Sequence, residues 1–474
     1  MNRAKIFLGS ECKSTQNYIE VKNPFNSNVV SSYPICTTSD VEMAYLKAKS
    51  ASKETKKSPL HQRVSWLEDV ANKLEEESEK FAKLICDEVG KPMIFARGEV
   101  NRCIETIRLS AHTMITISGE SFDTTAMPSG KKTLAFFKRV PVGVALAITP
   151  FNFPLNLVAH KIAPALVSGN AVVLKPSSAA PLCAYSLAKL FIESPYAVKD
   201  ALSVLYSGEG VNDALVTSKT PRVISFTGSV PVGNLITKRA GIKKIALELG
   251  GNAATFIDKS ANLKDAAKKC AIGAFVNSGQ VCISLQRIYV HVEVYDEFSK
   301  LLADESSKLV VGNPYDDKTF IGPMIDEDAV DKAKIWIANA KQEGAKVLFG
   351  GSNEGLVMEP TIMVDVKEDM NIVCQEVFAP IVSLIAKNDY EDALKSMNDS
   401  DFGLQYSIFT NNLATASKAI DDLDAGGVVI NDIPTLRFDI QPYGGFKQSG
   451  IGKEGPKFAI EDDYTEVKSV VICS

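Results

Sequence analysis

The sequence has neither the charge imbalance nor the long apolar runs that mark several classes of protein. Its 474 residues contain 52 Lys and Arg against 57 Asp and Glu, a formal net charge of -5 with no basic stripe. This balance argues against nucleic acid as a partner and against electrostatic attraction to membranes. No run reaches the roughly 18 apolar residues of a membrane span, and the N-terminus has too short an apolar run for a signal peptide. We expect a cytoplasmic protein without a membrane partner.

Disulfide frameworks and metal motifs are also missing. The chain has nine cysteines and four histidines, which form no Cys-x-x-Cys motif and no cluster at metal-ligand spacing. Scattered cysteines in odd number are typical of a reducing compartment, and we predict no metal site. Free cysteines are usually small buried hydrophobes. We expect eight of the nine cysteines to be buried in this way. They are Cys12, Cys36, Cys86, Cys103, Cys183, Cys270, Cys374 and Cys473.

What the chain does contain is a repeated alternation of strands and helices. Apolar residues make up 45% of the sequence, enough for more than one core. Apolar residues at helical spacing from Val41 to Val89 predict a helical layer. Apolar runs then alternate with helical segments, first at VALAIT, AVVLKP, LSVLYS and VISFTG, and later at ATFID, RIYVHV, AKVLFGG and GGVVIND. This is the pattern of buried parallel strands in doubly wound sheets.

We therefore predict an α/β fold with two doubly wound domains that meet near Gly250. The first domain would comprise residues 1–120 and 142–249, and the second residues 250–440. The pattern of residues 121–141 is typical of an extended β-hairpin rather than of either domain core, and that of residues 460–474 indicates a C-terminal strand. Each would expose strand edges in a monomer, so we expect them to pair between subunits.

The most informative single residue is Cys282, in the segment NSGQVCISL. It follows an alanine-rich segment with helical character. A thiol is the most nucleophilic side chain near neutral pH. Cys282 is thus a candidate covalent catalyst, provided that other segments supply its partners.

Two further segments place polar residues at predicted strand ends. Asn152 follows a strand in ITPFNFPLN, where its amide can donate into a crevice as an oxyanion hole requires. Lys175 ends the strand of AVVLKPSSAAP, where it can reach a ribose hydroxyl or a phosphate. Taken alone, the first is more often a cap or turn residue and the second a solvated strand end.

The segment from FTGSVPVG to LELGG adds an anion-binding turn and an acidic residue. Gly228 closes a strand, and the next helix would aim free N–H groups at an anion. The usual GxGxxG fingerprint is absent, so the dinucleotide signal is weak. Glu248 lies in the apolar strand IALELGG, where burial would raise its pKa toward the range of a general base. A paired buried glutamate is the alternative.

In this order the four segments resemble the NAD(P)-dependent aldehyde dehydrogenase superfamily, and the resemblance covers almost the whole chain. Further matches are QEVFAP at 375–380 and PYGGFKQSGIGKEG at 442–455. The resemblance implies an aldehyde dehydrogenase-like fold, in which the first domain is a Rossmann-like cofactor domain and the second carries the nucleophilic cysteine. It also implies that the hairpin and the terminal strand are oligomerisation elements of a homodimer or homotetramer.

The resemblance assigns roles to the catalytic residues. Cys282 would attack the aldehyde to form a thiohemiacetal, while Asn152 and the backbone N–H of Cys282 hold the oxyanion. Hydride transfer would leave a thioester, which water activated by Glu248 would hydrolyse. Since acylating relatives lack this glutamate, we expect water rather than coenzyme A as the acceptor.

The cofactor positions follow from the same resemblance. Glu376 and Phe378 match positions on the nicotinamide ribose and ring, and Lys175 matches one on the adenine ribose. The rest of the cofactor site is matched by Thr149, Pro150, Phe151, Gly208, Phe226, Gly228, Ser229 and Leu249. Many NAD-preferring members have a Glu three residues after the lysine, where this chain has Ser178. We therefore expect NADP, with NAD as a possible second cofactor.

The substrate pocket is predicted from fewer residues. The helix after Asn152 carries His160, and the segment EVNRCIETIR carries Arg102 where the family's substrate tunnel is lined. Val281, Ile283 and Arg437 complete the predicted pocket. Buried donors reject substrates that leave them unpaired, so we predict a small hydroxylated or anionic aldehyde. The motifs look most like the lactaldehyde and glyceraldehyde dehydrogenase branch.

Alternatives stay open at this point. Within enzymes, the substrate could be succinate semialdehyde or an aldehyde that bears a phosphonate or sulfonate, with Arg102 at the anion. From another class, the chain could be a non-catalytic structural relative, although such proteins tend to lose the nucleophile or the base. A cofactor-free thiol hydrolase would need a His or Asp partner for Cys282, and no histidine lies near it in sequence.

Overall fold

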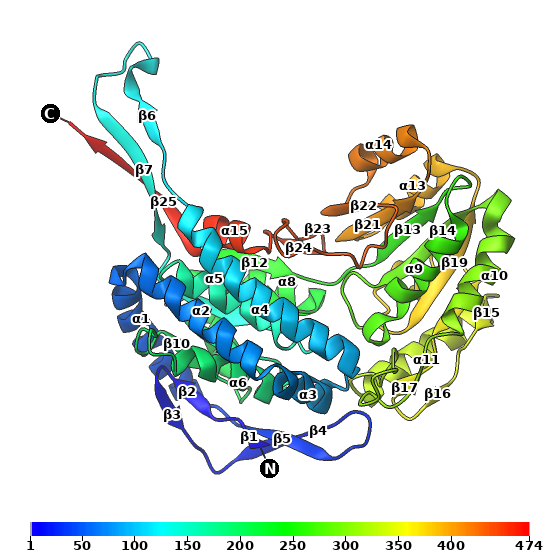
Figure 1. The fold of residues 1–474 in the computed structure, drawn as a ribbon, viewed down its shortest axis with the longest axis horizontal. Helices are drawn as coiled ribbons and strands as arrows, with labels where there is room; N and C mark the ends of the chain where they lie inside the picture. Colours follow the sequence, from blue (N-terminus) through cyan, green and yellow to red (C-terminus); the bar gives the residue numbers. More distant parts are fainter. Residues whose placement is uncertain (1, 474) are drawn as a thin grey trace.

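The computed structural model describes residues 2–473, which form two lobes and a projecting arm (Figure 1). Met1 and Ser474, the outermost residues of the predicted segments, lie outside the described residues. The chain crosses from the first lobe to the second through Gly250 and Gly251, between β12 (Lys244–Glu248) and β13 (Ala253–Ile257). A predicted seam near Gly250 corresponds to this crossing.

The first lobe is built on an eight-stranded sheet of order β24-β12-β11-β8-β9-β10-β2-β3. The strands from β12 to β10 are parallel, while β24, β2 and β3 run antiparallel to their neighbours. The parallel strands are covered on both faces, which explains their continuous apolar runs. Besides β12, the strands of this sheet are β2 (Ile6–Leu8), β3 (Glu11–Lys13), β8 (Val144–Ile148), β9 (Ala171–Lys175), β10 (Leu202–Val204), β11 (Val223–Thr227) and β24 (Gly450–Ile451).

Helices cover this sheet, and the predicted helical layer begins the series. The bounds are α1 (Thr38–Lys57), α2 (Leu60–Glu76), α3 (Ser78–Val89), α4 (Met93–Thr116), α5 (Asn156–Val167), α6 (Pro181–Ile192), α7 (Val211–Thr217) and α8 (Val230–Arg239). Buried side chains of the helices and the sheet form one continuous core. A small N-terminal sheet of β1 (Asn2–Arg3), β5 (Val29–Pro34) and β4 (Tyr18–Lys22) lies at the foot of this lobe (Figure 1).

The second lobe is built on a seven-stranded sheet of order β15-β18-β19-β14-β13-β21-β22. Its other strands are β14 (Leu285–His291), β15 (Lys346–Phe349), β18 (Thr361–Val364), β19 (Ile381–Lys387), β21 (Gln405–Phe409) and β22 (Gly427–Ile430). The covering helices are α9 (Leu263–Phe275), α10 (Tyr295–Ser306), α11 (Glu327–Gln342), α13 (Tyr390–Asn398) and α14 (Leu413–Asp422).

One strand of this lobe corrects the sequence prediction. AKVLFGG, expected in the parallel series, forms the edge strand β15, which runs antiparallel to β18. Its residues alternate between exposed and half-buried, because an edge strand is only partly covered by neighbours.

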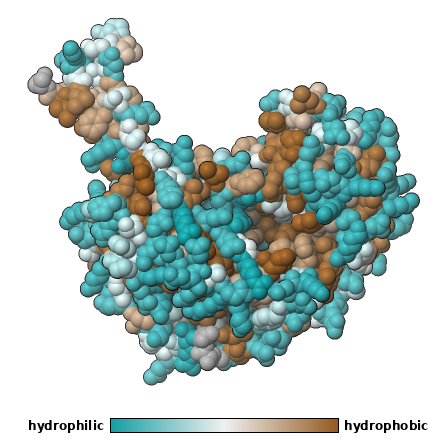
Figure 2. Space-filling model, viewed as in Figure 1, coloured by the Kyte–Doolittle hydropathy of each residue, from teal (hydrophilic) through white to brown (hydrophobic). Residues whose placement is uncertain are grey.

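The arm is a three-stranded antiparallel sheet of β6 (Ser121–Asp123), β7 (Leu134–Pro141) and β25 (Thr465–Ile472). The expectation that the hairpin and the terminal strand each expose their edges needs correction. They pair with each other in one chain along the whole of β7, because β7 and β25 leave the first lobe side by side (Figure 1). Exposed apolar side chains lie on this arm, as Figure 2 shows, and include Phe122, Leu134, Val467, Val471 and Ile472.

The burial of each cysteine depends on the element that carries it. Cys36, Cys86, Cys103, Cys183 and Cys270 are buried as predicted. The prediction is wrong for Cys12 on the edge strand β3 and for Cys473 after β25, which are exposed, and Cys374 is half-buried. No helix within residues 2–473 is long and apolar enough to cross a membrane.

Candidate active site

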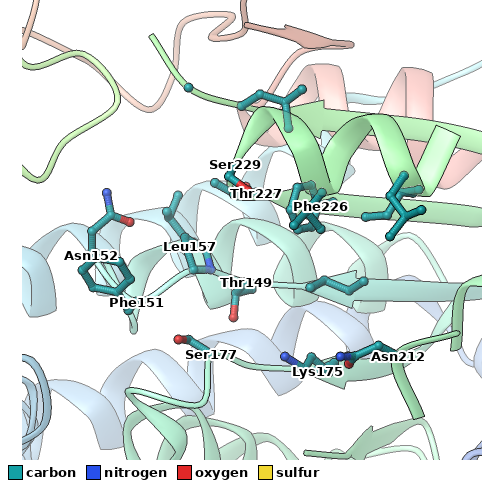
Figure 3. Close-up of a pocket in the computed structure, with 18 of the residues that line it drawn as sticks. Thr149, Phe151, Asn152, Leu157, Lys175, Ser177, Asn212, Phe226, Thr227 and Ser229 are labelled. Carbon is teal, nitrogen blue, oxygen red and sulfur yellow. The ribbon is translucent and has the colours of Figure 1, made fainter. Parts of the chain in front are cut away.

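A cleft of about 880 Å³ lies between the lobes, at the carboxyl ends of the parallel strands of the first lobe. Such strand ends are where open α/β sheets bind ligands. Figure 3 shows Asn152 and Phe151 toward one end of the cleft and Lys175 and Asn212 toward the other. The second lobe contributes Cys282, Lys332, Glu376 and Phe378.

A strained turn delivers Cys282 to the cleft. After α9, the three successive residues Asn277, Ser278 and Gly279 have φ values of 52°, 56° and 69°. This left-handed conformation is costly for residues other than glycine and is concentrated at functional sites. A side chain at Gly279 would collide with the carbonyl oxygen of Ala379. The chain therefore holds an unfavourable backbone in order to place the thiol.

The thiol of Cys282 lies 3.0 Å from the hydroxyl of Tyr443. The guanidinium of Arg437 lies over the Tyr443 ring, 3.8 Å from its centroid. Burial raises the pKa of Cys282 to about 12, although the Tyr443 hydrogen bond and the charge of Arg437 act in the opposite direction. The sulfur is thus a protonated thiol in the described state.

Asn152 is fixed to the loop of the cysteine. Its Nδ2 donates to the backbone carbonyl of Gln280 at 3.0 Å. A side-chain amide has two N–H donors, so one remains for a second acceptor. Behind this loop, buried Glu99 accepts from the backbone N–H groups of Leu155 and Asn156 at the start of α5.

Glu248 ends β12 as predicted, and it is buried. Its Oε2 has no hydrogen-bond partner among the described residues. Glu248 does not line the cleft but a second cavity of about 10 Å³, together with Glu454. Burial, followed by the charge of Glu454, raises the pKa of Glu248 well above its ordinary value.

Glu454 has the opposite character. Burial works against its ionisation, but the ammonium of Lys161 at 3.3 Å and the guanidinium of Arg437 at 3.1 Å lower its pKa to about 2. Of two neighbouring buried carboxyls, one therefore has a lowered pKa and the other a raised pKa.

The structure brings the predicted cofactor residues together with one exception. Those that line the cleft are Thr149, Pro150, Phe151, Lys175, Ser178, Phe226, Gly228, Ser229, Leu249, Glu376 and Phe378. Gly208 does not line it, because its Cα is packed against the carbonyl of Cys36, where a side chain would collide. The turn before α7 reaches the cleft instead through Asn212 and Asp213.

The lining carries features that fit a dinucleotide. Burial lowers the pKa of Lys175, whose side chain lines the cleft (Figure 3). Ser229 precedes α8 without a side-chain cap, so N–H groups at this helix start are free. Glu376 accepts from the backbone N–H of Gly251 at 3.0 Å, and burial raises its pKa to about 7. These groups match a phosphate-rich ligand with ribose hydroxyls.

The predicted polar pocket residues converge on a carboxylate that the sequence analysis missed. Asp439 accepts from Arg102 at 2.8 Å and lies 3.1 Å from both His160 and Arg437. Although partial burial of Asp439 acts in the opposite direction, hydrogen bonding to His160 and the nearby cations hold its pKa well below the usual range. We expected Arg102, His160 and Arg437 to be free for a ligand. This expectation needs correction, because all three already contact Asp439. Val281 and Ile283 pack beside Tyr443 and Leu404 in a small apolar cluster.

Three of the four site residues that the sequence analysis did not single out have features that could have identified them. Lys161 is a charged residue in a helix whose residues are all buried, so a buried partner was to be expected. Glu454 and Tyr443 lie within the near-terminal signature already quoted. Asp439 had no such signal, since its role depends on the approach of three distant segments. No group of at least three metal-ligating side chains occurs in the described part of the chain.

Comparison with known proteins decides the family. The model of the aldehyde dehydrogenase family matches residues 11–470. The chain belongs to this family. It is 42% identical to the 3-sulfolactaldehyde dehydrogenase of Priestia aryabhattai over 98% of this chain and 97% of that protein. It is 40% identical to the lactaldehyde dehydrogenase of Methanococcus aeolicus, over 98% of this chain and 99% of that protein.

A solved structure agrees with this membership. The NADP-dependent glyceraldehyde-3-phosphate dehydrogenase of Bacillus halodurans, complexed with NADP, superposes with a TM-score of 0.97 at 34% identity. The match covers 100% of this chain and 99% of the other. The predicted family and fold class are confirmed, and this aldehyde dehydrogenase is an oxidoreductase that acts on aldehydes.

The raised pKa of Cys282 predicts its reactivity without cofactor. Below a pKa of about 12, the thiolate fraction rises about tenfold for each pH unit. Alkylation of the Cys282 peptide by iodoacetamide should therefore increase steadily from about pH 7 to about pH 10 without a plateau. Mass spectrometry of the peptide separates it from exposed Cys12 and Cys473. A plateau near pH 8.5, the value of an ordinary thiol, would contradict this environment.

Proposed function

We propose that this aldehyde dehydrogenase oxidises a small polar aldehyde, such as lactaldehyde or glyceraldehyde, to its carboxylic acid with NAD(P) as the oxidant. The observation that carries the proposal is that Cys282 and Asn152 line the same cleft as the dinucleotide-type groups. Arg437 links this thiol, through Tyr443, to the polar cluster around Asp439. The nucleophile Cys282, the cleft for the cofactor and the polar cluster around Asp439 are thus connected to one another.

In the proposed reaction, the sulfur of Cys282 adds to the aldehyde carbon, and its proton passes to Glu248 in the ionised form of this carboxyl. Glu248 then loses this proton to water, so that it is ionised again before hydrolysis. The free N–H of Asn152 and the backbone N–H of Cys282 hold the resulting oxyanion. Removing one such donor typically costs about 2.7–4 kcal/mol of transition-state stabilisation. The bound nicotinamide supplies the hydride acceptor.

Hydrolysis completes the cycle. Ionised Glu248 turns from its cavity toward Cys282 and takes a proton from water, whose oxygen attacks the thioester carbon. The carbon–sulfur bond breaks, the acid leaves, and the thiolate of Cys282 is restored. The raised pKa of Glu248 makes it a stronger base toward this proton than an ordinary carboxylate.

The polar cluster supports a substrate with hydroxyl or anionic groups. A hydroxyl next to the aldehyde can donate to Asp439. An anionic group can replace Asp439 as the partner of Arg102 and Arg437. The second case favours the alternative substrates, succinate semialdehyde or a phosphonate- or sulfonate-bearing aldehyde, and the relative named 3-sulfolactaldehyde dehydrogenase supports the sulfonate.

The cofactor end of the cleft supports NADP. Ser178 bonds Ser207 at 3.1 Å, so no carboxylate stands where NAD-preferring relatives place a glutamate. Lys175 offers an ammonium, and the charge of Asp213 is compensated by its ion pair with Arg239. A 2′-phosphate therefore meets net positive charge, and the similar Bacillus halodurans structure is complexed with NADP.

Two single substitutions test the substrate pocket. Arg102→Ala should lower kcat/KM for anionic aldehydes by about tenfold or more, since a hydrogen bond to a charged group contributes about 1.5–3 kcal/mol. His160→Ala should lower it for hydroxyaldehydes, while propanal is little affected by either change. Arg108→Ala on the same helix α4, where Arg108 pairs with exposed Glu75, is the matched control. If neither Arg102→Ala nor His160→Ala changes the ranking of aldehydes, the pocket is wrongly assigned.

The cofactor proposal has its own test. Ser178→Glu should lower the ratio of kcat/KM with NADP to that with NAD by at least about tenfold, because juxtaposed like charges repel. Ser177→Glu, also in the cleft, shows whether any added charge has this effect. A native enzyme that strongly prefers NAD would defeat the proposal.

The rival classes separate in one assay. An increase in reduced-cofactor absorbance when NADP and glyceraldehyde are mixed with the enzyme identifies the dehydrogenase. A structural relative or a cofactor-free thiol hydrolase gives no signal with any aldehyde.

We also propose a homodimer or homotetramer in a reducing cytoplasm. The exposed apolar side chains of the arm and the outer edges of β6 and β25 support assembly. The free thiols, including exposed Cys12 and Cys473, support a reducing compartment. Light scattering after gel filtration should give a mass of two or four chains, and a monomer would contradict the assembly.

A further inference from the structure

The small cavity beside Glu248 is built almost entirely from polar and ionisable side chains. Its volume of about 10 Å³ is near the minimum that holds one water molecule. The lining residues come from α5, β11, β12 and the C-terminal segment, and are His160, Lys161, Ser225, Ala246, Glu248, Lys453, Glu454, Ala459, Asp463 and Tyr464.

Two buried polar atoms of this lining have no protein partner among residues 2–473. They are Oε2 of Glu248 and Nδ1 of His160. Buried polar groups rarely stay unpaired, and a polar cavity with room for one molecule is where an ordered water is expected. The geometry therefore places a water next to the proposed base.

Asp463 reaches this cavity because of an irregular helical turn. Residues Ala459–Tyr464 form a π-helical turn, which usually accommodates one extra residue and often occurs at functional sites. Along the turn, Asp462 is exposed, whereas Asp463 is 8% exposed. Asp463 thus lines the cavity and keeps a small exposed fraction.

The surroundings of Asp463 suit it for proton exchange. Burial raises its pKa to about 7, with Asp462 of the same turn acting in the same direction. From the neighbouring elements, the cations Lys161 on α5 and Lys244 on β12 lower it, and Glu454 raises it. A carboxyl of this kind binds and releases protons near neutral pH.

We infer that Asp463 is the outlet through which Glu248 loses the proton it gains in thioester hydrolysis. The inference rests on the proposed function. Water gives its proton to Glu248 as its oxygen bonds the thioester carbon, and the carbon–sulfur bond breaks. Glu248 then passes the proton to the cavity water, which releases one to Asp463, and Asp463 releases it to solvent. Asp463 touches no substrate, so it is a positioning and relay residue, not a catalytic one.

The test measures hydrolysis of the acyl-enzyme directly. After one turnover with NADP and glyceraldehyde, rapid quenching gives the rate of glycerate release, and absorbance gives the preceding burst of reduced cofactor. Asp463→Asn has the shape of the protonated carboxyl and should slow glycerate release about tenfold near pH 7. The burst rate should not change, and added imidazole should restore release by carrying the proton.

Asp462→Asn, the same charge change one residue away, is the control and should behave as the native enzyme. An Asp463→Asn enzyme with native release and a native pH profile would overturn the inference. So would a parallel loss of burst and release without imidazole rescue, which indicates a structural role. Should this variant not fold, Asp463→Ser is measured in the same way. Absence of any reduced cofactor with the native enzyme instead defeats the proposed function.

Discussion

The site depends on two neighbouring buried carboxyls, Glu248 and Glu454, whose negative charges would repel each other if both were ionised. Glu248 and Glu454 line the same small cavity, and like charges in a buried setting cannot both ionise readily. Lys161 and Arg437 both contact Glu454, so this carboxyl carries the charge. Glu248 is left with a raised pKa. The asymmetry gives Glu248, which has no ion pair among the described residues, a higher pKa and thus a stronger basicity than an ordinary carboxylate.

Arg437 connects this pair to the rest of the site. One guanidinium bonds Glu454, contacts Asp439 and lies over the ring of Tyr443, whose hydroxyl meets Cys282. A substrate group that displaces Asp439 would therefore act on the same cation that keeps Glu454 ionised. The two lobes make this possible, because Arg437 and Cys282 belong to segments that return to the carboxyl edge of the first sheet.

Much of the fold could be predicted from local pattern. Continuous apolar runs identified β8, β9, β10 and β11, since parallel strands are buried on both faces. The edge strand β15 was misassigned because a run of four residues does not reveal the direction of its neighbour. The pairing of β25 with β7 was missed because it joins segments more than 300 residues apart.

For the site, motifs predicted the residues that line the cleft better than those that partner them. Asn152 and Cys282, which line the cleft, were predicted from a strand end and a loop, and Glu248 was predicted from its place in an apolar strand. Asp439 was not, because its importance comes from Arg102, His160 and Arg437 meeting there, which is a property of the folded chain. Gly208 was misplaced because a motif match does not show which side of a turn faces the ligand.

The carboxyl pair is tested most directly by the pH dependence of acyl-enzyme hydrolysis in the native enzyme and in Glu454→Gln. Removing the charge of Glu454 leaves Lys161 and Arg437 facing Glu248, so the pKa of Glu248 should fall and the base should stay ionised to lower pH. The acid limb of the profile should then move down by about one pH unit or more, equivalent to about 1.4 kcal/mol. An acid limb that stays in place, or that moves to higher pH, would contradict the account.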